Sequence, residues 1–168
     1  LIHPPAEVVN TSEHLGGIEK SDLDSNVIWA WYGSLIESGS SSSSTYSRLV
    51  FKSTDAGNTW VNISSGLPAV HASTFIHNQN TAGDLYLGTD IGVFYYNDAI
   101  GYWVYFSDSL PNVIINKLEI VYPFSILRAA TFGRGVWQCN LPNVPVAGIS
   151  PAIQTAFAGQ TVVWRDST

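Results

Sequence analysis

The chain has 168 residues and a formal net charge of −6 at pH 7, and only 12% of its residues are charged, about half of the ~25% typical of a soluble domain. Its seven Lys and Arg residues are scattered, which argues against a nucleic-acid partner. No apolar run approaches the ~20 residues of a transmembrane helix, so no transmembrane segment is expected. The composition is poor in helix formers and rich in strand and turn formers, which indicates an all-β fold.

Short strand-like runs separated by turn residues follow one another in three units. In the first unit they are 18–21, 27–32, 48–53 and 60–63. In the second unit they are 71–77, 85–89, 93–96 and 103–106. The third unit offers only three runs, 117–121, 126–131 and 135–140, and is expected to lack its fourth strand. Residues 1–17 are expected to be a linker or the tail of a preceding unit.

A spacing of 43 residues relates these units. It separates the apolar-aromatic pairs that begin at Val50, Val93 and Val136, and it also separates Trp60 from Trp103. A period of about 40–50 residues made of short strands is typical of the four-stranded blades of a β-propeller. The sequence therefore predicts C-terminal propeller blades at 18–68, 69–111 and 112–142, and a partial propeller over 18–142.

A propeller needs roughly four to eight blades, so the remaining blades of the parent chain are expected upstream. Each blade buries its sheet faces against its neighbours. We therefore expect an arc with solvent-bare apolar flanks at both ends.

One hairpin carries a recognisable motif. The run from Ser53 to Trp60 fits the pattern S-x-D-x-G-x-T-W, and its fixed positions are Ser53, Asp55, Gly57, Thr59 and Trp60. It resembles the Asp-box of the bacterial neuraminidase repeat families, which include sialidases and xyloglucanase-like hydrolases. In a tight turn Asp accepts backbone N–H groups and Gly supplies a positive φ, so we expect a structural Asp-box. The second unit has a degenerate Asp-box that keeps Asp98 and Trp103.

Longer sequence segments resemble parts of known secreted proteins. Residues 85–94 and 127–137 resemble propeller segments of large secreted Bacteroidetes proteins. Residues 145–147 and 159–167 resemble the opening of a PKD-type Ig-like domain, so 143–168 are expected to form a linker and the first strands of a PKD/Ig-like β-sandwich. The resemblance implies type IX secretion and an extracellular or outer cell-surface location on a bacterium.

Candidate ligand-face residues lie in the loops that end the second and fourth strands of each blade, and they are Glu37, Tyr46, Asp90 and Asp108. Two carboxylates at a suitable separation could hydrolyse a glycoside, but surface Asp in turns is far commoner. No catalytic residue, metal site or cofactor is assigned. His71 and His77 lie about 20 Å apart along one strand, too far to share a metal. Cys139 is expected to be a buried, unreactive thiol.

These observations favour a non-catalytic fragment of a secreted or cell-surface multidomain propeller protein that offers a binding or adhesion surface. Its expected partners are the remaining blades of the parent chain and a glycan or another surface protein. Two alternatives stay open: part of an Asp-box glycoside hydrolase, sialidase- or xyloglucanase-like with catalytic residues on other blades, or an architectural spacer.

Overall fold

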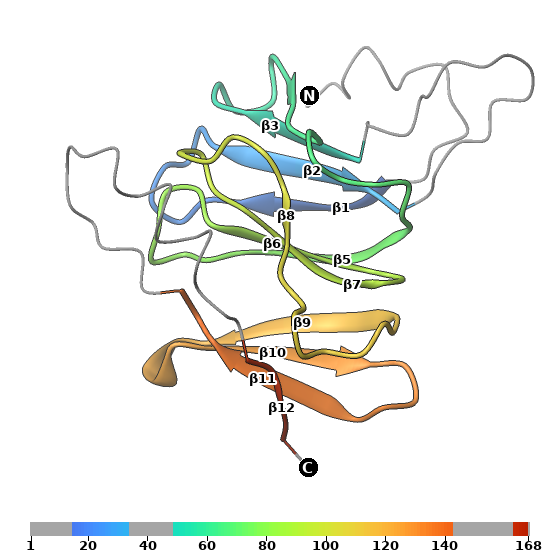
Figure 1. The fold of residues 1–168 in the computed structure, drawn as a ribbon. Helices are drawn as coiled ribbons and strands as arrows, with labels where there is room; N and C mark the ends of the chain where they lie inside the picture. Colours follow the sequence, from blue (N-terminus) through green and yellow to red (C-terminus); the bar gives the residue numbers. More distant parts are fainter. Residues whose placement is uncertain (1–14, 34–48, 143–162, 168) are drawn as a thin grey trace, which may run out of the picture.

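The computed structural model describes residues 15–33, 49–142 and 163–167. These residues form three four-stranded antiparallel sheets, which are stacked in chain order (Figure 1). Neighbouring sheets touch mainly through their first strands, because β1 contacts β5 and β5 contacts β9. No helix in the described ranges has the length and apolar character needed to cross a membrane.

Each sheet is a meander whose strands pair in sequence order. The first sheet contains β1 (Leu15–Lys20), β2 (Ile28–Tyr32), β3 (Val50–Ser53) and β4 (Val61–Asn62). The second contains β5 (Ala72–His77), β6 (Leu85–Thr89), β7 (Gly92–Tyr96) and β8 (Val104–Tyr105). The third contains β9 (Ile115–Val121), β10 (Ile126–Thr131), β11 (Val136–Asn140) and β12 (Arg165–Asp166). A short 3-10 helix, η1 (Tyr122–Phe124), connects β9 to β10.

Residues that are 43 positions apart also have equivalent cross-strand partners in the three sheets. Phe51, Phe94 and Trp137 occupy the same place in β3, β7 and β11, and they pair with Asn62, Tyr105 and Asp166 of the outer strands. The three sheets are therefore copies of one unit in their pairing as well as in their strand order.

Two boundaries differ from those expected from sequence. β1 begins at Leu15, so residues 15–17 belong to the first sheet. The third sheet is not three-stranded, because Arg165 and Asp166 pair with Gln138 and Trp137 of β11. The expectation of a missing fourth strand was wrong for a physical reason: the strand comes from beyond a long connection, which the constant spacing of the first two units does not predict.

Two apolar clusters fill the spaces between successive sheets. The cluster between the first and second sheets includes Trp29, Phe75, Leu85 and Trp103. The cluster between the second and third sheets consists largely of Tyr86, Tyr95, Phe106, Leu118, Leu127, Cys139 and Trp164. Cys139 is buried there as a free thiol, and burial raises its pKa to about 12. The thiol is therefore protonated and inert at neutral pH, as expected from the sequence.

The two outer faces of the stack differ in chemistry. On the first sheet the outward face is apolar, and it leaves Leu15 and Ile18 half exposed. It is not the solvent-bare flank that was expected, because Tyr32 and Phe51 of the same face are buried. The outward face of the third sheet is polar, and the apolar flank expected there was wrong. The cross-strand pairs place one row of side chains over all four strands of that face, formed by Glu119, Arg128, Gln138 and Arg165.

The corresponding rows explain the difference. The first sheet has Glu19, Trp29, Lys52 and Val61 in this row. The second has Ile76, Tyr86, Tyr95 and Val104. Both of these rows face the next sheet of the stack. The second position of the row is the aromatic Trp29 in the first sheet and Tyr86 in the second, and it is Arg128 in the third sheet.

Candidate functional site

The turn between β3 and β4, whose sequence resembles an Asp-box, closes on itself. Asp55 accepts the backbone N–H of Thr59 at 2.8 Å and the Thr59 hydroxyl at 2.6 Å. The Ser53 hydroxyl donates to Asp55 at 2.7 Å and accepts the backbone N–H of Gly57 at 2.9 Å. Ala56 and Gly57 take positive φ values of 57° and 89°, which reverse the chain. The polar side chains of the motif are thus bonded to one another or to the turn's own backbone.

Trp60, the last residue of the motif, is partly buried against Tyr32 and Phe51 of the outward face of the first sheet. The sequence predicts a largely buried ring at this position. The corresponding ring of the second sheet, Trp103, is only 2% exposed because it lies between two sheets. Trp60 has a described sheet on one side only, and this accounts for its greater exposure.

The acid sensitivity of this turn can be predicted. Hydrogen bonds from the side chain and backbone of Thr59 and from Ser53 lower the pKa of Asp55 from 3.8 to about 2. Because the folded-state pKa lies below the unfolded one, the turn contributes its full stability above about pH 4 and loses it as the pH falls through about 2. A carboxyl chemical-shift titration should give an apparent pKa near 2 for Asp55. The Asp55→Asn variant should lose this contribution at every pH above 4, whereas titration near the ordinary 3.8 would contradict the assigned hydrogen bonds.

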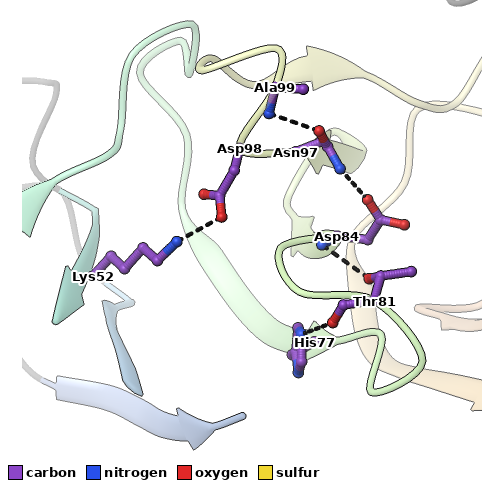
Figure 2. Close-up of polar contacts among 7 residues, drawn as sticks. All are labelled: Lys52, His77, Thr81, Asp84, Asn97, Asp98 and Ala99. Carbon is purple, nitrogen blue, oxygen red and sulfur yellow. Dashed lines mark hydrogen bonds and ion pairs between the residues drawn. The ribbon is translucent and has the colours of Figure 1, made fainter. Parts of the chain in front are cut away.

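The equivalent turn of the second sheet, interpreted from its sequence as a degenerate Asp-box, is bonded differently. Figure 2 shows Asp98, from the loop after β7, reaching across to Lys52 of β3 at 2.6 Å. The turn itself is held by Asn97, whose side-chain oxygen accepts the backbone N–H of Ala99 at 2.8 Å. Gly101, with φ of 74°, supplies the positive φ. Asp98 therefore joins two sheets instead of closing its own turn.

A buried polar cluster lies beside this ion pair (Figure 2). Asp84 is buried just before β6 and accepts hydrogen bonds from the Tyr95 hydroxyl at 2.7 Å and from the Asn97 side-chain amide. The His77 Nε2 bonds to the carbonyl oxygen of Thr81 at 2.9 Å. A carbonyl only accepts, so Nε2 carries the proton. Burial, the largest effect, lowers the pKa of His77, so its imidazole is neutral at pH 7.

The His77 ring also packs against Trp29 of β2, with ring centroids 4.5 Å apart. The cluster therefore joins the first two sheets through the ion pair between Lys52 and Asp98 and the ring contact between Trp29 and His77. The Asp84 carboxylate, whose partners are neutral donors, joins parts of the second sheet only. It contains neither a nucleophile paired with a base nor two carboxylates paired as acid and base. Within the described ranges no three His, Cys, Asp or Glu side chains gather as metal ligands would. The arrangement is suited to holding sheets together.

The structure describes two of the four candidate ligand-face residues, and these two differ in their contacts. Asp90, in the loop between β6 and β7, accepts the backbone N–H of His71 at 3.1 Å, and its own N–H donates to the carbonyl of His71 at 3.0 Å. Its carboxylate thus ties this loop to the residue before β5. Asp108 is exposed in the loop that follows β8, at the same end of the sheet. Glu37 and Tyr46 lie outside the described residues.

The same end of the third sheet carries a feature that the sequence prediction missed. Phe132, in the loop between β10 and β11, is 68% exposed, and the neighbouring Ile114 is also exposed. The backbone N–H of Phe132 donates to the carbonyl of Ile114 at 2.9 Å. Gly133 and Gly135, both with φ of 74°, shape the loop. The sequence does contain a signal for this exposed ring, because Phe132 directly precedes the turn formed by Gly133, Arg134 and Gly135.

The outward face of the third sheet is hollowed. The hollow has a volume of about 640 Å³ and is lined by Glu119, Arg128, Val136, Gln138 and Ser167. Arg128 lies 3.9 Å from the Glu119 carboxylate, and its Nε donates to the Gln138 side-chain oxygen at 3.4 Å. This surface is open and polar, unlike the closed apolar spaces between the sheets.

No family model matches the sequence, and no curated protein matches it. The solved structures that share its arrangement of strands include the following two. One is the GH74 xyloglucanase of Xanthomonas campestris, with a TM-score of 0.55 at 15% identity over 74% of this chain and 19% of the enzyme. The other is the Cps50 (Swd1) β-propeller domain of Myceliophteria thermophila, with a TM-score of 0.56 at 13% identity over 82% of this chain and 42% of that domain.

Both neighbours are β-propeller proteins, and the described sheets have the fold of propeller blades. The chain spans less than half the length of either neighbour.

Proposed function

We propose that this chain is a non-catalytic part of a secreted or cell-surface multidomain β-propeller protein, and that the end of the blades bearing Phe132 binds a glycan or another surface protein. The observation that carries the proposal is an aromatic ring left 68% exposed on a turn whose backbone is held in place. Aromatic residues are enriched where proteins bind partners, because they offer a large contact area at a small cost in conformational entropy.

The turn that presents Phe132 is held by side-chain and backbone hydrogen bonds. The Thr131 hydroxyl donates to the carbonyl of Gly135 at 2.7 Å, and the Thr131 N–H donates to the same oxygen at 3.0 Å. The Trp137 indole N–H donates to the carbonyl of Arg134 at 2.8 Å. A ring presented in this way loses little freedom on binding.

Two alternatives remain distinguishable. In a glycoside hydrolase the acid and base would lie on other blades, since Asp90 is engaged by the backbone of His71. In an architectural spacer the loops would bind nothing. The start of a PKD-type domain that was expected over 143–168 does not include residues 164–166, because Trp164 is buried between the second and third sheets and Arg165 and Asp166 pair with β11. Type IX secretion and an extracellular location are part of the same proposal. The resemblance of the sequence to secreted Bacteroidetes proteins supports these assignments.

The experiment compares two exposed phenylalanines at opposite ends of the third sheet. Phe132 lies in the loop after β10, and Phe124, which is 71% exposed, lies in η1 before β10. Binding to immobilised xyloglucan, mucin glycans and a panel of bacterial surface proteins should be measured for the wild type and for each alanine variant. We expect Phe132→Ala to weaken binding at least tenfold, about 1.4 kcal/mol, and Phe124→Ala to leave it unchanged.

Other outcomes of this experiment would favour the alternatives. Equal losses from both variants, or no binding to any probe, would contradict the proposed surface, and the absence of binding would favour a spacer. Release of reducing sugar ends by this chain would favour the hydrolase, and its loss in Asp90→Asn or Asp108→Asn would place the carboxylates on these blades instead of on others.

A further inference from the structure

The outer strand of the third sheet reaches its place by an unusual route. In the first two sheets the fourth strand follows the third after a turn of seven residues, from Ser53 to Val61 and from Tyr96 to Val104. In the third sheet 24 residues separate Asn140 from Arg165. β12 is therefore held in its sheet by what it contacts, and much less by a tight hairpin.

Trp164, which directly precedes β12, occupies the same slot as Trp103. The indole N–H of Trp103 donates to the carbonyl of Ile63 at 2.8 Å, and that of Trp164 donates to the carbonyl of Phe106, also at 2.8 Å. Ile63 and Phe106 are themselves 43 residues apart, so the two acceptors are equivalent positions of successive sheets. Both rings are almost fully buried, at 2% and 3% exposure.

The backbone around Trp164 repeats the pattern of the other outer strands. The N–H of Ser167 donates to the carbonyl of Val136 at 2.8 Å, as the N–H of Phe106 does to that of Val93. The N–H of Trp164 donates to the Ser109 hydroxyl at 2.6 Å. The slot therefore recognises an extended backbone along β11 and one indole ring, which is the pattern of peptide binding by strand addition.

We propose that the edge of β11, together with the indole slot beside Phe106 and Ser109, is a binding groove for an extended peptide with tryptophan at the Trp164 position. Residues 163–167 occupy the groove from within the chain. The same segment of a second molecule, or a peptide of that sequence, occupies it in exchange. This groove lies on a sheet edge and is independent of the loop surface proposed above.

The long connection between β11 and β12 favours the exchange of residues 163–167 between molecules. The connection of 24 residues between β11 and β12 is more than three times as long as the seven-residue turns of the other two sheets, and the entropic cost of closing a loop rises with its length. The pairing is also short, because only Arg165 and Asp166 form ladder pairs with β11. Most of the binding then depends on the Trp164 ring.

The first test uses the full chain and a fluorescein-labelled peptide of residues 161–168. The Trp164→Ala variant should free the groove and bind the peptide at least tenfold more tightly than the wild type does. The Val163→Ala variant, changed at the exposed neighbouring position, should behave like the wild type. A peptide with alanine in place of tryptophan should not bind. Equal binding of both peptides, or no binding to a Trp164→Ala chain that still unfolds cooperatively, would overturn the proposal.

A second test does not depend on the folding of the Trp164→Ala variant. Gln138 and Arg165 are cross-strand partners, so a Gln138→Cys chain and an Arg165→Cys chain, mixed under mild oxidation, should form an interchain disulfide if the strand exchanges. Buried Cys139 faces the opposite side of β11 and serves as the background in the wild type. Crosslinking within a Gln138→Cys/Arg165→Cys chain, combined with none between the mixed single variants, would show a fixed strand and overturn the exchange.

Discussion

Trp103→Ala is expected to lower the free energy of unfolding by about 3–5 kcal/mol, the cost of deleting a large buried aromatic side chain. The ring fills the space between the first two sheets, where it lies against Phe75 and Tyr96 with centroids 6.4 and 5.4 Å away. Its removal also leaves the Ile63 carbonyl without the indole donor. The cost is thus both a cavity and a lost buried hydrogen bond.

Chemical denaturation of the wild type, Trp103→Ala and Tyr102→Ala would check this. Tyr102 is the adjacent residue and is 51% exposed, so its replacement should change stability by no more than about 0.5 kcal/mol. Similar losses from the two variants would show that the 43-residue tryptophan positions do not hold the sheets together.

Gly66→Ala is expected to be the second most damaging change. Gly66 has φ of 90°, and a Cβ there would lie 2.4 Å from the backbone oxygen of Trp103. The left-handed conformation costs a non-glycine residue about 1–2 kcal/mol, and forcing two backbones apart adds about 1–3 kcal/mol. The sum should appear as a lower midpoint of unfolding.

Gly101→Ala is the matched control for this change. Gly101 also has a positive φ, of 74°, but a Cβ there would meet nothing within 4 Å. It should cause only the conformational cost of about 1–2 kcal/mol. If the two variants lose equal stability, the close approach between Gly66 and Trp103 carries no energetic weight.

The sequence predicted the strands well where the 43-residue period holds. The runs 85–89 and 126–131 match β6 and β10 residue for residue, and the other predicted strands differ from the observed ones by at most three residues at either end. Local pattern is sufficient there because each strand pairs with its neighbour across a short turn. The hydrogen bonds at Asp55 were predictable for the same reason, since its partners Ser53 and Thr59 lie within the turn.

The features that were missed depend on contacts between distant parts of the chain. β12 has no equivalent at the 43-residue spacing, so only the pairing with β11 shows it. The ion pair between Lys52 and Asp98 joins residues of two sheets, and the degenerate motif that contains Asp98 does not predict it. The polarity of the third sheet's outward face was visible in Lys117, Glu119 and Arg128, which lie away from the stack. The expectation of an apolar flank assumed that both faces of every sheet are buried, and the alternation of polar and apolar side chains along these strands contradicts that assumption.

The row of Glu119, Arg128, Gln138 and Arg165 restricts which sheet can come next in the stack. The second sheet presents Phe75, Leu85 and Leu87 toward its predecessor, and such a surface packed on the third sheet would bury Arg128 and Arg165 against hydrocarbon. Removing a charge from water costs several kcal/mol per ion, and the long 3.9 Å contact of Arg128 with Glu119 would offset little of that cost. A sheet that follows the third must therefore bring carboxylates of its own. The row thus disfavours a purely apolar sheet as the next neighbour of the third sheet, and the apolar face of the second sheet could not be repeated there without this cost.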